Sequence, residues 1–296
     1  MVVQPDGLAA ASVRRQAGAR PAVTLASFFP GTVDVDALER AGKEVHAGDY
    51  RCTTVLAGGD YQFMSVEAPN VPREELRTAM RWRMKDILDF PVDEATFDLL
   101  ELPPPPGGGR PQQSLFAVAA RNSVVAARQQ LFAGAKVKLR AIDIPEMAQR
   151  NISAMLEADG RGVAMLSFAA DGGLLTVSWN GELYLSRRID VTLAQLLDTD
   201  HERKTASFDK ITLELQRSLD HFERQFSFIG IAKLVLAPSA VDGLEAYLSG
   251  NLYTRVETLD LATLFELEGQ PELQDPAGQC RFFVPLGAAL RDEVAA

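Results

Sequence analysis

Few residues in this sequence have the type and spacing that acid–base or metal chemistry needs. The histidines His46, His201 and His221 lie in separate segments, so they form no metal-ligand pair and offer no evident general base for a hydrolase. Cys52 and Cys280 lie far apart and belong to no CxxC or Cys/His cluster, so neither a disulfide framework nor a zinc site is predicted. We expect both cysteines to be buried small hydrophobic residues in a reducing compartment.

Acidic residues followed by glycine are the remaining candidates for chemistry. Asp6-Gly7 and Asp171-Gly172-Gly173 place a carboxylate and a glycine in turns of similar position, where they could hold Mg²⁺ through water. Asp-Gly is also the commonest way to turn between two antiparallel strands. We favour the turn interpretation for both.

A rough internal duplication positions these two turns. Residues 1–30 read as strand, Asp-Gly turn, strand, turn and strand, and residues 162–191 repeat this plan. In the second copy, Asn180-Gly181 between two strand-like runs predicts a type I′ hairpin. Since helical and strand segments follow each meander, we expect an α/β fold of two lobes, residues 1–160 and 161–296, with the last helix packing back on lobe one.

Lobe one carries a segment of different character at about residues 70–135. It begins with a predicted helix over 72–88, whose apolar residues recur at three- and four-residue spacing: Leu76, Met80, Met84 and Ile87. Arginines form a row on another side, which we interpret as a solvated face, with partner contact as the alternative: Arg73, Arg77 and Arg81. Two strands follow at 96–102 and 114–120, joined by a proline- and glycine-rich surface loop at 103–109.

The second half has one strong helical pattern, over 208–226, with a single apolar stripe that indicates packing on a sheet: Ile211, Leu215, Leu219, Phe222 and Phe226. The polar tract Asp198–Ser207 lacks periodicity and predicts an exposed loop. We then expect a short buried strand at KLVLA, a helix over 241–248, a strand near 254–259, and a loop over 268–278. That loop leads through 282–284 to a closing alanine-rich helix.

Composition excludes several classes of protein. At 296 residues and 47% hydrophobic content, the chain has the length of about two domains and enough apolar residues for two cores. Its net charge of −10 opposes binding to nucleic acid or to anionic lipid. No apolar window is long enough for a membrane span, and the N-terminus lacks the layout of a signal peptide. Because the first strand begins at once with Met1, we expect the natural chain to start earlier.

Five segments in order resemble the PilM family of type IV pilus assembly proteins, and more closely its MshI branch from mannose-sensitive haemagglutinin (MSHA) pilus biogenesis. They are AMRWRMKDILDFP (79–91), AIDIPEMAQRNI (141–152), NGELYLSRRIDV (180–191), LELQRSLDHFERQ (213–225) and VDGLEAYL (241–248). The resemblance implies an actin-like fold with an inserted subdomain in lobe one. It also implies a cytoplasmic protein held at the inner membrane by other pilus platform components, and a partner of the PilN type that presents a short N-terminal cytoplasmic peptide.

Members of this family that bind ATP do so with three loops, which need glycine for close phosphate approach and a carboxylate for Mg²⁺. In the first loop this chain has Gln4, Pro5 and Asp6, so the expected carboxylate and glycine are missing and Pro5 removes an N–H donor. The first loop is therefore degenerate.

The second and third loops also lack the residues that nucleotide binding needs. The second loop has Ser167-Phe168-Ala169 where a D-x-G pattern is expected, and the third has Ala237-Pro238-Ser239 where a glycine run is expected. We expect Phe168 or Pro238 to narrow the crevice between the lobes. The sequence thus favours a scaffold that is not an enzyme and has no cofactor, with weak ATP or Mg²⁺ binding as a residual possibility.

Two alternatives stay open. One is an active ATPase or sugar-kinase-like phosphotransferase of the same fold, and the other is the cytoplasmic domain of a type II secretion platform protein of the GspL type. Titration with MgATP separates the enzyme from the scaffold.

The resemblance points to the boundary between core and insertion for the partner peptide, along a groove between the helix at 72–88 and the strand at 114–120. Trp82 is rotated away from the apolar stripe of its helix and lies among arginines, so it is a candidate anchor. Phe90 would line the groove and Phe116 would form its floor. The alternative is that Trp82 packs between the inserted subdomain and the core.

Overall fold

The computed structural model describes residues 1–16, 18–103 and 114–291. Its first lobe is built on β1 (Val2–Gln4), β2 (Gly7–Arg14), β3 (Ala22–Pro30), β4 (Cys52–Val55) and β8 (Leu139–Asp143). Strands β1, β2 and β3 form an antiparallel meander, and β4 and β8 form a parallel pair that lies against β1. The amino group of Met1 donates to the backbone oxygen of Thr53 at 2.8 Å and joins the two parts.

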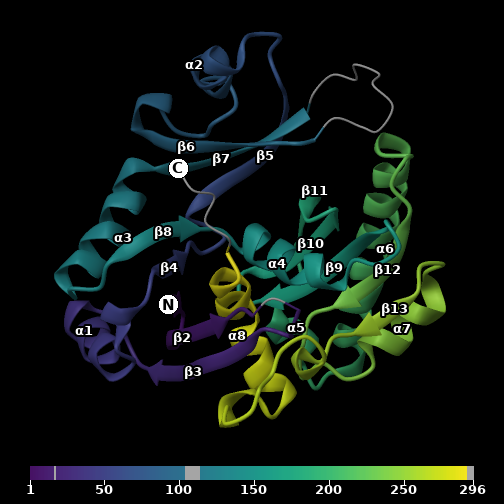
Figure 1. Cartoon of the computed structure of the whole chain (residues 1–296). Coiled ribbons are helices and arrows are strands. Elements are labelled where there is room, and N and C mark those ends of the chain that lie inside the picture. The colour runs from purple at the N-terminus through teal and green to yellow at the C-terminus, as the bar shows by residue number, and fades with distance from the viewer. Residues whose placement is uncertain (17, 104–113, 292–296) are drawn as a thin grey trace.

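The second lobe repeats this plan with β9 (Gly162–Ala169), β10 (Gly172–Trp179), β11 (Glu182–Ile189), β12 (Ile231–Leu236) and β13 (Val256–Thr258). Its strand order is β11-β10-β9-β12-β13, with antiparallel pairs in the meander and parallel pairs beyond it. The two meanders lie in separate sheets, as the duplication predicts (Figure 1). Asn180 and Gly181 have φ of 52° and 74°, which agrees with the predicted type I′ hairpin.

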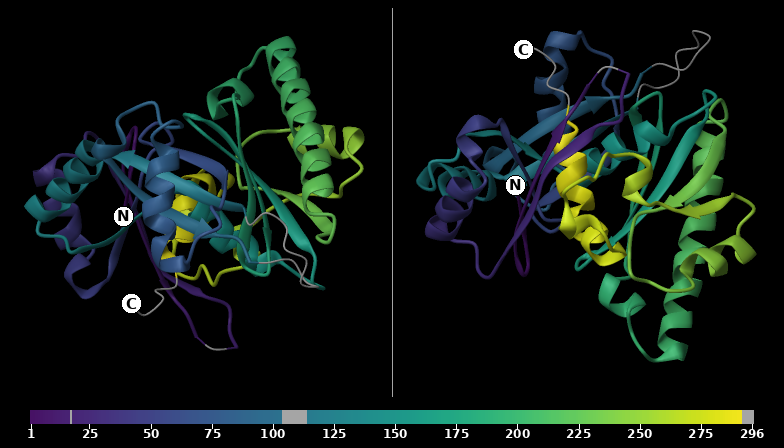
Figure 2. Two further views of the ribbon diagram at one scale, coloured as in Figure 1. Left: turned by 90° about the horizontal axis from the view of Figure 1, so that it is seen from above. Right: turned by 60° about the horizontal axis from the view of Figure 1, so that its bottom comes forward.

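Helices cover these sheets and fill the space between them. They are α1 (Val35–Glu44), α2 (Arg73–Met84), α3 (Asn122–Gly134), α4 (Pro145–Ser153), α5 (Leu193–Leu196), α6 (His201–Gln225), α7 (Leu244–Asn251) and α8 (Pro276–Ala289). Figure 2 shows α4 and α8 side by side between the two lobes. They approach so closely that a Cβ at Gly287 of α8 would lie 2.7 Å from the carbonyl carbon of Ala148 of α4.

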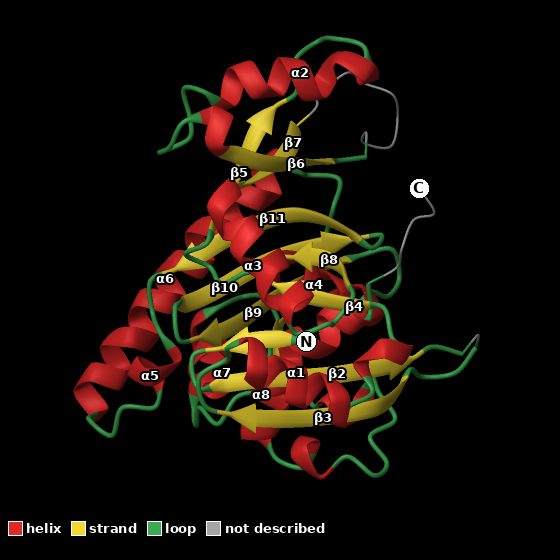
Figure 3. Cartoon of the chain, turned by 90° about the vertical axis from the view of Figure 1, so that its left-hand side faces the viewer, coloured by secondary structure: helices red, strands yellow, loops and turns green. Residues whose placement is uncertain are grey.

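The insertion is a small sheet covered by α2. Its strands β5 (Tyr61–Glu67), β6 (Ala95–Glu101) and β7 (Ser114–Arg121) are antiparallel in the order β5-β7-β6, and α2 lies across one face (Figure 3). Met80 and Met84 are fully buried there, but Ile87 is exposed because α2 ends at Met84. The proline- and glycine-rich loop predicted at 103–109 lies, apart from Pro103, outside the described residues.

Three predictions about the second half need correction. The tract Asp198–Ser207 is not a loop, since α6 begins at His201, where the Asp200 carboxylate accepts from the N–H of Glu202 at 2.9 Å. Likewise α8 begins at Pro276 and contains residues 282–284, because Asp275 caps it by accepting from Gly278. The helix predicted over 241–248 is α7, which begins three residues later, at Leu244.

The cores follow the periodic patterns more faithfully. All five residues of the predicted α6 stripe are buried, in one cluster with the lobe-two sheet. Cys52 is buried and Cys280 is half-buried, and both are free thiols.

Candidate functional site

The first predicted nucleotide loop is the turn between β1 and β2, and an arginine of α8 fills it. Nη1 of Arg281 donates to Oδ2 of Asp6 at 2.8 Å, and its backbone oxygen accepts from Gln4 at 2.8 Å. The same guanidinium stacks on the ring of Phe28, 3.7 Å from its centroid. Pro5 has no N–H to offer a phosphate. The Asp6 carboxylate is already paired with the guanidinium of Arg281.

The second loop, Ser167-Phe168-Ala169, ends β9 with its side chains on alternate faces. Ser167 donates to Oε1 of Gln149 on α4 at 2.5 Å, while Ala169 is exposed. Phe168 is buried in the cluster that contains the inner face of α6. The expectation that Phe168 narrows the crevice between the lobes is therefore wrong, because alternation along β9 turns its ring into the core of lobe two.

The third loop follows β12 directly. The N–H of Ala237 donates to the Leu166 oxygen at 2.8 Å and extends the pairing with β9. Ala237 and Pro238 are buried and Ser239 is half-buried. A narrowing of the crevice by Pro238 stays a prediction.

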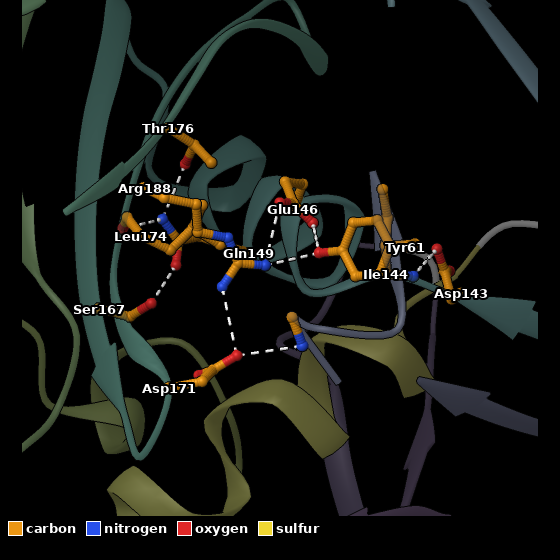
Figure 4. A network of polar contacts seen from close by, with 11 residues as sticks. Tyr61, Asp143, Ile144, Glu146, Gln149, Ser167, Asp171, Leu174, Thr176 and Arg188 are labelled. Carbon is orange, nitrogen blue, oxygen red and sulfur yellow. Dashed lines mark hydrogen bonds and ion pairs between the residues drawn. The ribbon is translucent and has the colours of Figure 1, made fainter. Parts of the chain in front are cut away.

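A polar cluster joins the lobes beside the second loop (Figure 4). Nη2 of Arg188 on β11 donates to the Tyr61 hydroxyl at 2.6 Å and lies 3.2 Å from Oε1 of Glu146. Tyr61 donates in turn to Oε2 of Glu146. Oδ2 of Asp171, in the turn between β9 and β10, lies 3.6 Å from Nη1 of Arg188 and accepts from the N–H of Gly58 at 3.0 Å. We call these five residues the interlobe cluster.

The environment of the interlobe cluster raises the pKa of two of its members, Tyr61 and Arg188. Burial, and then the charge of Glu146, raises the pKa of the Tyr61 hydroxyl far above its ordinary value, so Tyr61 stays protonated and can donate. Burial alone would lower the pKa of Arg188, but the oxygens of Tyr61, Glu146 and Asp171 outweigh it and raise that pKa. At neutral pH the cluster therefore keeps a charged guanidinium facing two carboxyl groups and a hydroxyl donor.

No local sequence pattern indicates this cluster, since its members come from β5, α4, β11 and two turns. The available signal is Glu146 directly after Ile144-Pro145: a carboxylate in an apolar helix start, here 1% exposed, requires a cation or strong donors. Among the described residues, no group of three or more His, Cys, Asp or Glu side chains is arranged to hold a metal ion. None of the described helices combines the length and the apolar character of a membrane span.

The three residues predicted to bind the partner peptide do not lie together. Trp82 is 71% exposed on the outside of α2, so the alternative in which it packs between insertion and core is wrong. Phe90 is buried in the cluster beneath α2. Phe116 is buried on the opposite face of β7, with its ring centroid 4.9 Å from that of Phe63. Since α2 packs directly on β7, these positions border no common groove, and the binding role of Trp82 stays a prediction.

The basic row on α2 is paired within the insertion. Each arginine reaches an acidic residue on or just before β6: Arg73 to Glu101 at 3.1 Å, Arg77 to Asp98 at 3.3 Å and Arg81 to Asp93 at 2.8 Å. The side chains are largely exposed, so the row is a solvated face whose charges are already balanced, and contact with a partner is not needed to explain it.

A surface cavity of about 560 Å³ lies between α3 and β8. It is lined by Gln129 and Ala133 of α3 and by residues 136–142, the run that includes most of β8. Consecutive residues of a strand point to alternate faces, so a cavity lined by all of them lies along the strand edge. Among the described strands β8 pairs with β4 alone. Lys138 and Arg140 lie along this second edge, and Lys136 beside it is paired with Glu39 at 2.8 Å. Sequence reasoning missed this edge, although Val137, Leu139 and Ala141 alternate with Lys138 and Arg140 in the two-residue period of a strand.

Comparison with solved structures shows which fold the chain has. No protein-family model matches the chain, and no curated protein does. A solved PilM–PilN type IV pilus biogenesis complex matches 98% of this chain and 96% of its own, with a TM-score of 0.74 and 20% sequence identity.

More distant matches include the cytoplasmic domain of EpsL, an inner membrane component of the type II secretion system of Vibrio cholerae, at 15% identity and a TM-score of 0.41 over 65% of this chain and 76% of that one. Another is a Bacteroides thetaiotaomicron protein of unknown function with an actin-like ATPase fold, at 9% identity and a TM-score of 0.48 over 90% and 95%. With its duplicated strand order and its likeness to the PilM–PilN complex, the chain has the actin-like α/β fold that its sequence predicts.

Proposed function

We propose that this chain is a non-catalytic scaffold of a type IV pilus assembly platform, which binds the N-terminal cytoplasmic peptide of a PilN-type inner-membrane protein. In this proposal the protein is cytoplasmic and reaches the inner membrane through its partners. The match to a PilM–PilN complex over nearly the whole chain supports the choice of system. The finer assignment to the MSHA branch rests on the sequence motifs alone.

The observation that carries the scaffold proposal is that arginines of the chain lie against the carboxylates of both hairpin turns, one in the first expected nucleotide loop and one beside the second. Arg281 pairs with Asp6 at 2.8 Å, and Arg188 lies 3.6 Å from Asp171. A carboxylate that would ligate Mg²⁺ must be free of such a cation, and the turn must present N–H groups to phosphate. These residues do not suit a bound nucleotide and metal, so the proposal includes no catalytic step.

For the peptide we propose the cavity between α3 and β8. The second edge of β8 offers backbone groups to an extended peptide, which would add a strand beside it. Lys138 borders that edge, is exposed, and would favour an acidic side chain or a carboxylate on the peptide. Trp82 is the alternative contact, on the outer face of α2.

Calorimetric titration tests both parts of the proposal. We expect the synthetic PilN-type N-terminal peptide to bind, and Ala133→Trp, which fills the cavity from an exposed position on α3, to weaken binding at least tenfold, or ~1.4 kcal/mol. Ala127→Trp is the matched control, since Ala127 is exposed on the same helix and does not line the cavity.

The two titrations fail in different ways. Unchanged peptide affinity in Ala133→Trp would move the site away from the cavity. A dissociation constant for MgATP in the low micromolar range would overturn the scaffold proposal and favour the ATPase, whereas no heat at millimolar MgATP supports it.

A further inference from the structure

The interlobe cluster connects elements that no sheet or helix joins. Gly58 and Tyr61 belong to lobe one, Asp171 and Arg188 belong to lobe two, and Glu146 lies in the first turn of α4 between them. Three of its contacts cross between the lobes or to α4: Arg188 to Tyr61, Arg188 to Glu146, and the N–H of Gly58 to Asp171. Any opening of the lobes at this point must break them.

Breaking these contacts is unfavourable because of where Glu146 lies. Its side chain is 1% exposed, so its carboxyl oxygens are satisfied by Arg188 and the Tyr61 hydroxyl rather than by water. A buried carboxylate that loses the cation beside it carries most of its desolvation penalty uncompensated. The Arg188 side chain is 37% exposed, so it could turn toward solvent if it were not held by three oxygen-bearing partners.

The interlobe cluster lies beside the second expected nucleotide loop and spans the two lobes. Asp171 lies in the β9–β10 turn, next to the segment where the second nucleotide loop is expected, and Gly58 follows β4 in the opposite lobe. In a nucleotide-binding protein of this fold, a ligand between the lobes would contact loops on both sides and hold them together. In this chain the contacts between the two lobes are made by Arg188 and by the Asp171 carboxylate, without a ligand.

We propose that the interlobe cluster is a built-in clamp that holds the two lobes closed without nucleotide. Arg188 is its central positioning residue, and the tie between Asp171 and Gly58 is its exposed end. The clamp does not depend on the identity of the partner, so it can be tested apart from peptide binding.

Two variants open the clamp without leaving a lone buried charge. Asp171→Ala removes the acceptor of the Gly58 N–H at a side chain that is 43% exposed. The double variant Glu146→Gln, Arg188→Met removes the buried carboxyl group and its cation together while roughly preserving side-chain volume. Arg187→Met is the matched control, because Arg187 is the exposed neighbour of Arg188 on β11.

Hydrogen exchange of the Gly58 amide and small-angle X-ray scattering of the whole chain report opening. We expect exchange at Gly58 to be at least tenfold faster in both opening variants, with a larger radius of gyration, and unchanged in Arg187→Met. Millimolar MgATP should alter neither quantity in the wild type. Wild-type exchange and dimensions in both opening variants would overturn the clamp. Slower exchange at Gly58 on addition of MgATP would also overturn it, because closure would then belong to the nucleotide.

Discussion

Gly287→Ala and Gly250→Ala are the same chemical change in two helices, yet we expect opposite effects on stability. Gly250 lies exposed near the end of α7, and a Cβ there would meet no atom within 4 Å. Alanine should stabilise the protein by about 0.5 kcal/mol, because it reduces the conformational freedom of the unfolded chain.

At Gly287 the same gain, of at most about 1 kcal/mol, is outweighed by a clash with α4. The added Cβ would lie 2.7 Å from the carbonyl carbon of Ala148, where ordinary contact begins at 3.4 Å. The obstacle is the backbone of Ala148, so α8 must move away from α4 by most of an ångström. A gap of that size between α4 and α8 forfeits a quarter to a half of the energy of each dispersion contact there. With an overpacking cost of about 3 kcal/mol, the net loss is about 2 kcal/mol.

Urea unfolding followed by circular dichroism measures both changes, provided that the slope of free energy against urea stays constant across the three proteins. The hydrogen bond from Asn151 to the Gly287 oxygen, at 2.9 Å, should be disturbed only in Gly287→Ala. If Gly287→Ala proves as stable as Gly250→Ala, then α4 and α8 do not pack as closely as the structure describes, and the account of how the lobes are joined must be revised.

Three further outcomes are expected. Trp82→Ala should change stability by less than about 0.5 kcal/mol, because the side chain is 71% exposed; loss of peptide affinity in this variant would make Trp82 the anchor, and full affinity would favour the cavity at β8. Asp200→Ala should cost about 1 kcal/mol in urea unfolding, because it removes the N-cap of α6, and no loss would mean that the first turn of α6 frays. Hydrogen bonds from Lys136 and then Lys43 lower the pKa of Glu39 from 4.5 to about 2. Because the pKa is lower in the folded state, these bonds stabilise the folded protein at neutral pH, and that stabilisation is lost as the pH falls from about 4.5 to about 2. Lys136→Met should flatten the fall in stability across that window, and an unchanged profile would contradict the pairing.

The regular parts of the fold could be predicted because local patterns determine them. The Asn180-Gly181 hairpin follows from two residues that tolerate positive φ, and the α6 stripe follows from 3.6-residue periodicity against a sheet. The first turns of α6 were missed because they are mostly exposed and so carry little apolar periodicity. Asp200 was the readable signal, since a capping carboxylate can start a helix that has no apolar face.

The candidate site was only half predictable. Each loop's lack of glycine and carboxylate is visible in the sequence, but the side chains that fill the space are not. Arg281 is 275 positions from Asp6, and Tyr61 is 85 positions from Glu146, so only the folded topology brings them together. For the same reason Phe168 was assigned to the wrong side of β9: a strand residue faces one side or the other according to its register, and register is fixed by pairing partners distant in the sequence.

The two Asp-Gly turns share an electrostatic arrangement as well as a place in the duplicated fold. Asp6 pairs with Arg281 at 2.8 Å and Asp171 with Arg188 at 3.6 Å, and in each case the arginine comes from a separate element, α8 or β11. Each guanidinium also lies over an aromatic ring, 3.7 Å from the centroid of Phe28 and 5.9 Å from that of Tyr61. If a turn had only lost nucleotide binding, its carboxylate would be hydrated by solvent rather than paired with an arginine. Here arginine provides positive charge at both turns. At Asp171 that arginine, Arg188, is also the central residue of the interlobe cluster, which is consistent with lobes held together without a ligand.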